Sequence, residues 1–376
     1  DCGADGGSAD NRAACALALS RVPKGGTLHV PRGKWKTGPI VLTSDMTLWL
    51  DEGAELSAIS ERDNWPVLEA HDASGSVLGS WEGLPERCFA GVVSAVNARH
   101  VSIIGPGTID GGGSCGDWWS WPKETRDGAR RPRTIHLISC NDITMIGPKI
   151  CNSPSWTVHP YRCKGVVASA LRISNPPDSP NTDGFNPESC EDVRMEGIRF
   201  SVGDDCIAIK SGKRSRHENR HLAPTRNISI RHCLMERGHG GVVLGSEMSG
   251  GIHDITVEDC EMVDTDRGLR IKTRRGRGGE VSGVLFRRID MSGVQTGFTA
   301  NAFYFCDADG HDAWVQDRSA APVDDTTPVI RDILVEDISV TGVTVAVGAF
   351  LGLPEAPISG IRLRNVAASF DPMTEA

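Results

Sequence analysis

A short hydrophobic pattern recurs along most of the chain. Two apolar residues stand at positions i and i+2, usually with a third at i+5, as in Val193, Met195 and Ile198. Alternation at i and i+2 is typical of β-strands. Most successive repeats begin 23 to 29 residues apart, and the larger intervals indicate inserted loops. The repeats begin at Val101, Ile143, Val166, Val193, Ile228, Ile255, Val284, Ile333 and Ile361.

Repeats of this length indicate either a solenoid or a propeller. A propeller blade needs about 40 residues and four strands, whereas 23 to 29 residues fit one rung of a parallel β-helix. Each rung buries its inward side chains against the neighbouring rungs. We therefore predict an all-β fold, a parallel β-helix of one domain over residues 1–376. Inserted loops are expected at about 51–97, 110–135 and 304–328.

One segment before the repeats has helical character. Residues 9–22 carry Asp10 as a candidate N-cap and apolar residues at helical spacing, and Pro23 ends the pattern. We expect this amphipathic helix to cap the exposed first rung. Short strands are expected after it at 27–30, 40–42 and 47–50.

The net charge and the distribution of basic residues limit the kinds of ligand that the protein can bind. The formal net charge of -9 argues against nucleic acid, and no apolar run approaches the length of a membrane span. Two basic runs, at 210–216 and 267–277, are either solvated loops or the walls of a groove for an anionic ligand. Among the twelve cysteines, Cys233 and Cys260 are predicted to stack in the core. Cys2 and Cys15 are better disulfide candidates, with the pairing left open.

Four polar clusters follow the repeats on what we predict to be four consecutive rungs. Rungs stack about 4.8 Å apart, so the set can span roughly 15 Å, the size of a site for a few sugar rings. The clusters are Asn181–Gly184, Gly203–Asp205, Gly238–Gly240 and Arg270–Lys272.

Three carboxylates stand in these clusters, Asp183, Asp204 and Asp205. Like charges in a small area separate their protonation, so one carboxyl can stay an acid while another is a base. Glycoside hydrolysis needs that division. Each cluster alone is more often a solvated turn, and a lone histidine such as His239 is more often structural.

The ordered set resembles glycoside hydrolase family 28, the polygalacturonase family. The stretches Val202–Gly212, Gly245–Gly251 and Gly105–Gly111 resemble its bacterial branch. The resemblance implies a right-handed parallel β-helix that hydrolyses α-1,4-galacturonosyl linkages of pectin with inversion. It implies no metal and no cofactor.

The resemblance also assigns roles. Asp204 would be the general acid, Asp183 and Asp205 would activate the water, and His239 would support the site. An inverting mechanism places the acid and base carboxyls roughly 6.5–9.5 Å apart. The substrate-binding residues would be Asn181, Arg270, Lys272 and, on a looser match, Tyr304. One departure is Asn186, where family members often have an acidic residue.

Several alternatives stay open. The inserted loops could wall off one end of a groove, which favours an exo-acting enzyme over an endo-polygalacturonase. The tryptophans in these loops, such as Trp118 and Trp121, could stack on sugars or pack in a core. A rhamnogalacturonan or xylogalacturonan hydrolase of the same family is the next candidate. A pectate lyase would need calcium ligands and an arginine base, and a non-catalytic polysaccharide-binding β-helix would not need three clustered acids. The expected partner is an anionic galacturonan, with no nucleic acid or membrane. We expect a monomer. It would be secreted or periplasmic, or else cytoplasmic and acting on imported oligomers.

Overall fold

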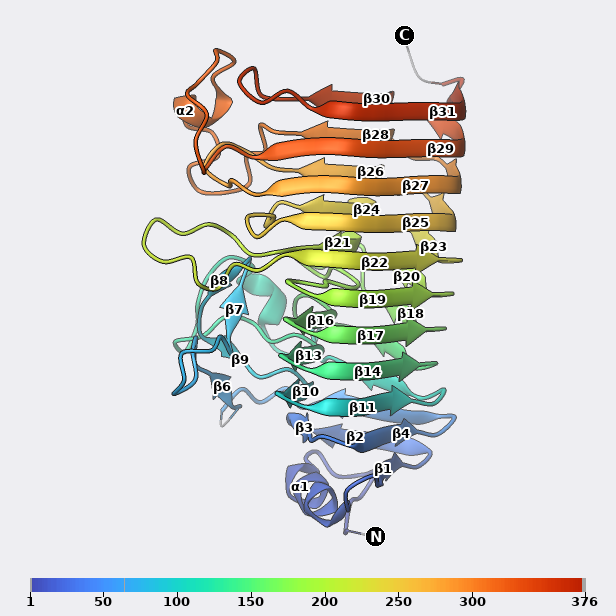
Figure 1. The fold of residues 1–376 in the computed structure, drawn as a ribbon. Helices are drawn as coiled ribbons and strands as arrows, with labels where there is room; N and C mark the ends of the chain where they lie inside the picture. Colours follow the sequence, from blue (N-terminus) through green and yellow to red (C-terminus); the bar gives the residue numbers. More distant parts are fainter. Residues whose placement is uncertain (1, 64, 374–376) are drawn as a thin grey trace. The chain divides into compact units, whose positions relative to one another are not determined.

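The computed structural model describes residues 2–63 and 65–373. They form two compact units, each a stack of short parallel strands (Figure 1). The first unit comprises Asp1–Trp81, Pro85–Asn186 and Val193–Asp204, and the second comprises Glu82–Leu84, Pro187–Asp192 and Asp205–Ala376. The strand β19 (Glu191–Glu196) contains residues of both units.

The first unit winds the chain through three columns of strands, each paired in parallel with the strand one rung later. The first column is β1 (Thr27–Val30), β4 (Met46–Leu50), β11 (Arg99–Ile104), β14 (Asn141–Ile146) and β17 (Lys164–Ser169). The second is β2 (Gly33–Thr37), β5 (Ala54–Ala58), β12 (Thr108–Asp110), β15 (Lys149–Cys151), β18 (Arg172–Ser174) and β20 (Arg199–Ser201). The third is β3 (Ile40–Leu42), β10 (Val93–Val96), β13 (Ile135–Ile138) and β16 (Val158–Tyr161).

Alternating side chains build the core of each rung. In β1, Leu28 and Val30 are buried while Thr27 and His29 are exposed, as expected where successive side chains point to opposite faces. The third residue of the repeat is buried as well, for example Ile198. The repeat read from the sequence is therefore the inward-facing set of each rung.

The second unit has two main columns. One consists of β22 (Thr225–Arg231), β23 (Leu234–Glu236), β25 (Ile252–Val263), β27 (Glu280–Ser292), β29 (Val329–Val343) and β31 (Ser359–Phe370). The other is a five-stranded parallel sheet of β21 (Asp205–Ile209), β24 (Gly240–Gly245), β26 (Arg267–Lys272), β28 (Thr296–Asn301) and β30 (Ala346–Leu351).

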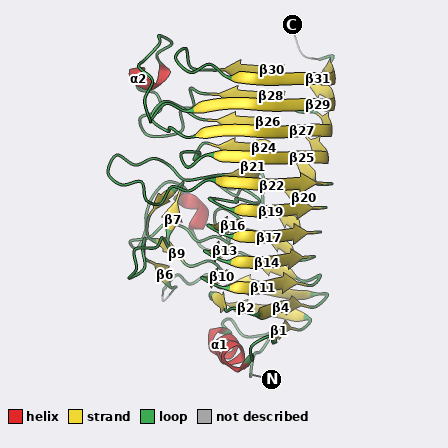
Figure 2. Cartoon of the chain, viewed as in Figure 1, coloured by secondary structure: helices red, strands yellow, loops and turns green. Residues whose placement is uncertain are grey.

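Two strands of the five-stranded sheet are buried on both faces, as β13 and β16 are in the first unit. Every residue of β21 and β24 is buried, so the outward side chains are covered as well as the inward ones. Because the strands are parallel, their carboxyl ends meet at one edge, where long loops follow them (Figure 2). Lys272 and the residues that follow β21, β24 and β26 lie at this carboxyl edge, whereas Asp205 and His239 lie where their strands begin.

The predicted N-terminal helix is present as α1 (Arg12–Arg21). It begins after Asn11, and the Asp10 carboxylate accepts the backbone N–H of Arg12 at 2.8 Å. The helix contacts β2 and β3. The helix expected to be amphipathic shows little of that character, because none of its residues is fully buried.

The insertion expected at 51–97 is shorter than predicted. β5 pairs with β2 and β12, and β10 pairs with β3 and β13, so both are rung strands. The small residues of β5 and β10 hide the repeat. The remaining insertion carries the strands β6 (Val67–Leu68), β7 (Ser80–Trp81), β8 (Leu84–Pro85) and β9 (Cys88–Phe89). The other two insertions carry η1 (Trp118–Ser120) and α2 (Ala313–Gln316).

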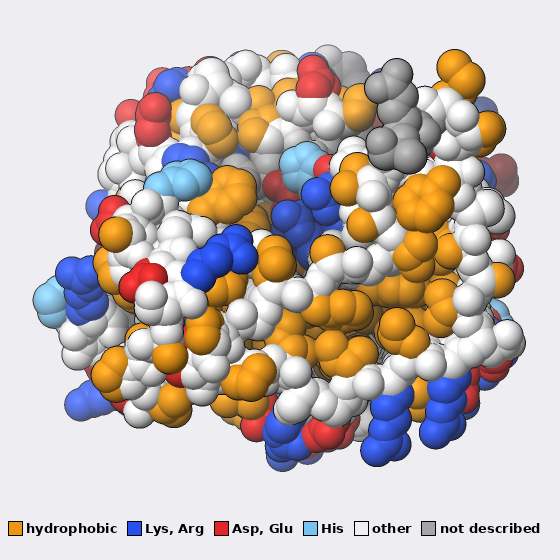
Figure 3. All heavy atoms as spheres, turned by 90° about the horizontal axis from the view of Figure 1, so that it is seen from above, with side chains coloured by type: hydrophobic (Ala, Val, Ile, Leu, Met, Phe, Trp, Pro, Cys, Tyr) orange, Lys and Arg blue, Asp and Glu red, His pale blue; other side chains and the backbone are white. Residues whose placement is uncertain are grey.

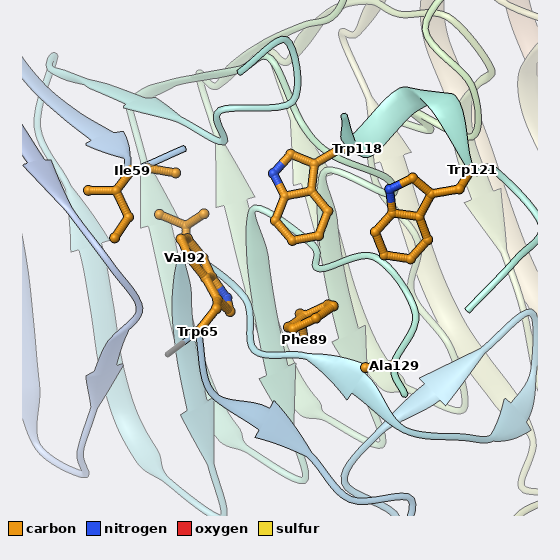
Figure 4. Packing of buried hydrophobic residues seen from close by; sticks show 8 residues of the cluster. Ile59, Trp65, Phe89, Val92, Trp118, Trp121 and Ala129 are labelled. Carbon is orange, nitrogen blue, oxygen red and sulfur yellow. The ribbon is translucent and has the colours of Figure 1, made fainter. Parts of the chain in front are cut away.

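Aromatic residues of the first two insertions form a core of their own (Figure 4). Trp118 and Trp121 lie 5.6 Å apart by ring centroids, and Phe89 packs edge-on against both. Trp121 is fully buried. These two tryptophans therefore stabilise the insertions and offer no ring face for a sugar.

The cysteines and the ends of the molecule complete the fold. Cys233 and Cys260 are buried, and the Cys233 N–H lies 3.5 Å from the Cys260 sulfur, which confirms the predicted stacking. All twelve cysteines lie in the described part of the chain and none is bridged, including Cys2 and Cys15. The end of the molecule seen in Figure 3 exposes many hydrophobic side chains. In the last strands, β30 and β31, Phe350 and Phe370 are exposed. No helix among residues 2–63 and 65–373 has the length and apolar character to cross a membrane.

Candidate active site

Asp183 belongs to the first unit and lies in the loop that follows β18. Its side chain is buried, and one carboxylate oxygen accepts a hydrogen bond from Asn186 Nδ2 at 2.8 Å. Its backbone carbonyl accepts the N–H of Thr157 at 2.8 Å. Asn186 is fully buried. The residue that departs from the family pattern is thus the one that holds the Asp183 carboxylate.

Asp204, half-buried, is the last residue of the first unit. The preceding Gly203 packs so closely on the loop before Asp183 that an added Cβ would lie 2.5 Å from the Ser179 carbonyl oxygen. It would also lie 2.6 Å from the Pro176 carbonyl oxygen. The lack of a side chain at Gly203 therefore brings the segment of Asp204 against the segment that leads to Asp183.

Asn181 is held by Arg131, a residue that the sequence did not indicate. The guanidinium donates to Asn181 Oδ1 at 2.6 Å and to the Pro180 carbonyl at 3.0 Å. It also donates to the carbonyls of Pro154 and Pro122, at 2.7 and 3.0 Å. Arg131 is fully buried. Since a guanidinium has only donors, the Asn181 oxygen must face Arg131 and the amide nitrogen must face away from it.

Asp205 belongs to the second unit and begins β21. Its buried carboxylate accepts from Lys272 Nζ at 2.7 Å, and Arg270 Nη1 lies 3.8 Å from its other oxygen. β26, which carries both basic residues, is two strands from β21 in the sheet, with β24 between them. The predicted alternation of Arg270 and Lys272 about the buried Ile271 is confirmed, and both cations face the acid.

His239 lies in the loop that leads into β24, and its side chain is exposed. Its backbone carbonyl accepts from Arg270 Nη1 at 3.4 Å. A Cβ added at the following Gly240 would lie 3.4 Å from Asp205 Oδ1. The glycine therefore keeps the space beside the acid open.

Tyr304 follows β28 and covers the basic pair. Its ring centroid lies 5.3 Å from Lys272 Nζ and 5.8 Å from Arg270 Cζ, within the range of cation–π contacts. Burial, together with the neighbouring Cys306 thiol, raises the pKa of Tyr304 above its ordinary value. The phenol is therefore neutral over the range in which carboxylates titrate.

A second charged group lies at the same carboxyl edge and was not anticipated. Lys210, which follows β21, donates to Glu247 at 2.7 Å, and both side chains are buried. Burial acts to raise the pKa of Glu247, but Lys210 and Arg277 outweigh it and lower the pKa well below its ordinary value. Nothing in the spacing of the two residues signals this pair. In the part of the chain that the structure describes, no three His, Cys, Asp or Glu side chains gather as a metal site would require.

The stacked parallel strands are those of a parallel β-helix. The chain belongs to the glycosyl hydrolases family 28, whose family model matches residues 27–370. The fold is accordingly the right-handed parallel β-helix predicted from the resemblance.

Known relatives extend over most of the chain. A probable polygalacturonase of Vitis vinifera is 35% identical over 91% of this chain and 66% of its own length. An endo-polygalacturonase of Pectobacterium parmentieri is 30% identical over 76% of this chain and 70% of its own. Among solved structures, a hyperthermoactive exopolygalacturonase from Thermotoga maritima has a TM-score of 0.79 at 24% identity, and the match covers 97% of this chain and 89% of that one. This chain therefore spans about two thirds of the Vitis protein.

Proposed function

We propose that the protein hydrolyses α-1,4-galacturonosyl linkages of polygalacturonate or its oligomers with inversion. The observation that carries the proposal is the arrangement around Asp205. A buried carboxylate, two cations and an aromatic ring converge on one sheet, with Lys272 Nζ 2.7 Å from the acid and 5.3 Å from the Tyr304 ring. A substrate that carries a carboxylate next to a glycosidic bond needs both charges: cations bind the carboxylate and acids cleave the linkage.

The roles follow the chemistry of each acid. Asp204, the half-buried one, is proposed as the general acid that protonates the leaving oxygen. Asp183 and Asp205 are proposed to hold and activate the water. Asn186 donates to Asp183 and Lys272 donates to Asp205, so each of these carboxylates is held by a donor and keeps acceptor capacity for a water.

Binding is assigned to the remaining residues. Arg270 and Lys272 are proposed to hold a galacturonate carboxylate, with Tyr304 against the sugar and Asn181 donating from its amide nitrogen. His239 is proposed to support the acid. No metal or cofactor enters this mechanism.

We propose exo action, because the insertions are large and packed. The first two share the buried aromatic core around Trp118, so they form fixed walls. Solved structures titled exopolygalacturonase, from Thermotoga maritima and Yersinia enterocolitica, have TM-scores of 0.79 and 0.72 with this chain. An endo-acting relative at 30% identity keeps endo-polygalacturonase as the alternative.

The first test is a product time course on polygalacturonate with calcium chelated, following reducing ends and absorbance near 235 nm. Saturated monomer or dimer from the outset supports an exo-hydrolase, and a ladder of oligomers makes the enzyme endo. Unsaturated products that need calcium would instead identify a lyase. D204N should lose at least about a thousandfold in kcat as the general acid is removed, while D290N, at an exposed position of β27, should keep wild-type activity.

Partner and compartment follow from the substrate. We propose an anionic galacturonan as the partner and an extracellular or periplasmic site of action, because pectin polymers lie outside the cytoplasm. We expect a monomer. Fractionation of the native cells and sedimentation of the purified protein check these two points.

A further inference from the structure

Beyond the basic pair, more cations gather at the carboxyl edge of the five-stranded sheet, and they surround one carboxylate. Asp307, in the loop that joins β28 to β29 and carries α2 (Figure 1), accepts from Lys213 Nζ at 2.5 Å through one oxygen. Its other oxygen accepts from Arg274 Nε at 2.9 Å and from Arg277 Nη2 at 2.6 Å. Lys213 comes from the loop after β21, and the two arginines come from the loop after β26.

The three cations are enclosed rather than solvated. The side chains of Arg274 and Arg277 are 8% and 3% exposed, and those of Lys213 and Asp307 are 18% and 12% exposed. Burial acts to raise the pKa of Asp307, but Arg277 and Lys213 lower it below its ordinary value. The carboxylate is thus charged, dehydrated and bound on both oxygens, as a bound ligand carboxylate would be.

The arginines carry more donors than the loop supplies acceptors. Arg274 also donates to Asp309 at 2.6 Å, yet its Nη1 and the Nε of Arg277 are buried without a hydrogen-bond partner among the described residues. Most buried polar groups in folded proteins have a hydrogen-bond partner, so these two N–H donors can still take a further acceptor. The cluster therefore has binding capacity beyond its resident side chain.

The cluster also continues the proposed substrate site. Arg270, Lys272 and Arg274 stand at two-residue spacing along β26 and its end. The loop residue Tyr304, whose ring covers Arg270 and Lys272, donates its backbone N–H to the Thr273 carbonyl at 3.0 Å. Asp307 follows Tyr304 by three residues. One short segment of loop thus runs from the first carboxylate-binding pair to the second cation cluster.

We propose that Lys213, Arg274 and Arg277 form a second uronate-carboxylate subsite, and that Asp307 fills it as a built-in substitute for the substrate's carboxylate. A galacturonan carries one carboxylate on every sugar. While Asp307 is bound, the carboxylate of a further uronate residue is excluded from this subsite. Removal of Asp307 exposes the subsite. The role in substrate length rests on the proposed function, whereas the capacity to bind a carboxylate does not.

The test is rescue of D307A by a free carboxylate. The variant removes the carboxylate that Lys213, Arg274 and Arg277 share and leaves only Arg274 paired, with Asp309, so its thermal midpoint should fall by about 5 °C or more. Free galacturonate at about 20 mM should restore at least half of the loss by binding to the folded state. Glucose at the same concentration, and sodium chloride at the same ionic strength, should restore little. The wild type, in which Asp307 occupies the subsite, should gain less from galacturonate than D307A does.

The matched control is D325A. Asp325 belongs to the same loop and pairs with Arg214 at 3.0 Å, but its side chain is 78% exposed. It should lose little stability and show no rescue. If D307A does not fold, D307S also removes the carboxylate, leaves most of its space empty and should show the same rescue. No difference between galacturonate and chloride, in whichever variant folds, overturns the subsite.

A second arm connects the subsite to substrate length. In D307A, KM for long oligogalacturonates should fall severalfold relative to KM for the dimer, and longer products should appear. Rescue without hydrolysis of any galacturonan by the wild type would retain the subsite and refute the proposed function. Hydrolysis without rescue would do the reverse.

Discussion

Asn186 has an amide side chain at a position where family members often have an acidic residue. An acid there would lie beside the Asp183 carboxylate. The Asn186 Nδ2 lies 2.8 Å from Asp183, and the side chain has no exposure to solvent. In N186D the two buried carboxylates would share a site, and like charges raise the pKa of one of them. Because Asp183 must be ionised to act as a base, the acid limb of the kcat profile should move up by about one pH unit. Steady-state rates between pH 3.5 and 7 measure this shift.

The matched control is N227D. Asn227 also donates its amide to an aspartate, Asp192, but the pair lies exposed on the surface. The same substitution there should leave the pH profile unchanged. An unshifted acid limb in N186D would mean that Asp183 is not the base.

We expect a substitution of Arg131 to change KM much more than kcat. A lysine at this position keeps the charge but cannot make the four hydrogen bonds that fix Asn181 and three proline carbonyls. The Asn181 amide would then rotate and lose its fixed donor, so KM should rise about tenfold while kcat changes less than threefold. R130K is the control, since Arg130 pairs with Glu86 instead. An equal loss in both variants would indicate a structural effect only.

Single residues also show what the sequence could not reveal about the site. The ordered clusters identified Asp205, Arg270 and Lys272, which the structure brings within 2.7 to 3.8 Å of one another as donors and acceptor. Arg131 and Asp307 escaped notice because they lie in insertions, where no repeat gives a register. Their roles depend on side chains that fold back over the sheet. Residue spacing along the chain does not predict such contacts.

At the scale of elements, the buried Lys210–Glu247 pair ties the ends of β21 and β24 together. K210M would leave Glu247 charged and buried without its main partner, which typically costs about 3–5 kcal/mol. The thermal midpoint should therefore fall by several degrees. The double variant K210M/E247M should recover much of the loss, because two apolar side chains need no partner.

The control for this prediction is an exposed pair. Arg220 and Glu218 lie 3.2 Å apart with side chains 92% and 62% exposed. R220M should change the midpoint little, since surface pairs contribute little to stability. A K210M midpoint that matched that of R220M would contradict the importance of the buried pair.

Some strands and helices were predicted more accurately than others. The repeat predicted the inward residues of rungs such as β25 and β27, because burial between rungs imposes strict alternation. It failed at β5 and β10, where alanine stands at inward positions, namely Ala54, Ala58 and Ala95. The helix α1 was found from its capping and breaking residues, but its amphipathic character was overestimated, since helical spacing alone does not show how far a face is covered.

The whole molecule should lose stability as the solution becomes mildly acidic, through His136. It lies fully buried in β13, its ring stacks on His159 of β16 at 5.0 Å, and neither ring nitrogen has a hydrogen-bond partner among the described residues. Burial, together with the charges of His159 and Arg133, lowers the pKa of His136 well below its ordinary value of 6.5.

The sign of the effect follows from proton binding. Below pH 6.5 the unfolded chain binds a proton at His136 that the folded protein does not, so stability falls as the pH falls. One such group contributes about 1.4 kcal/mol per pH unit. H136F keeps a ring against His159 and removes the titration, so its thermal midpoint should fall less than that of the wild type between pH 6.5 and 5. H29F, at an exposed position of β1, is the control and should follow the wild type. If H136F and the wild type lost stability in parallel over this range, the buried histidine would not be the cause, and the carboxylates paired at the carboxyl edge would be the next groups to test.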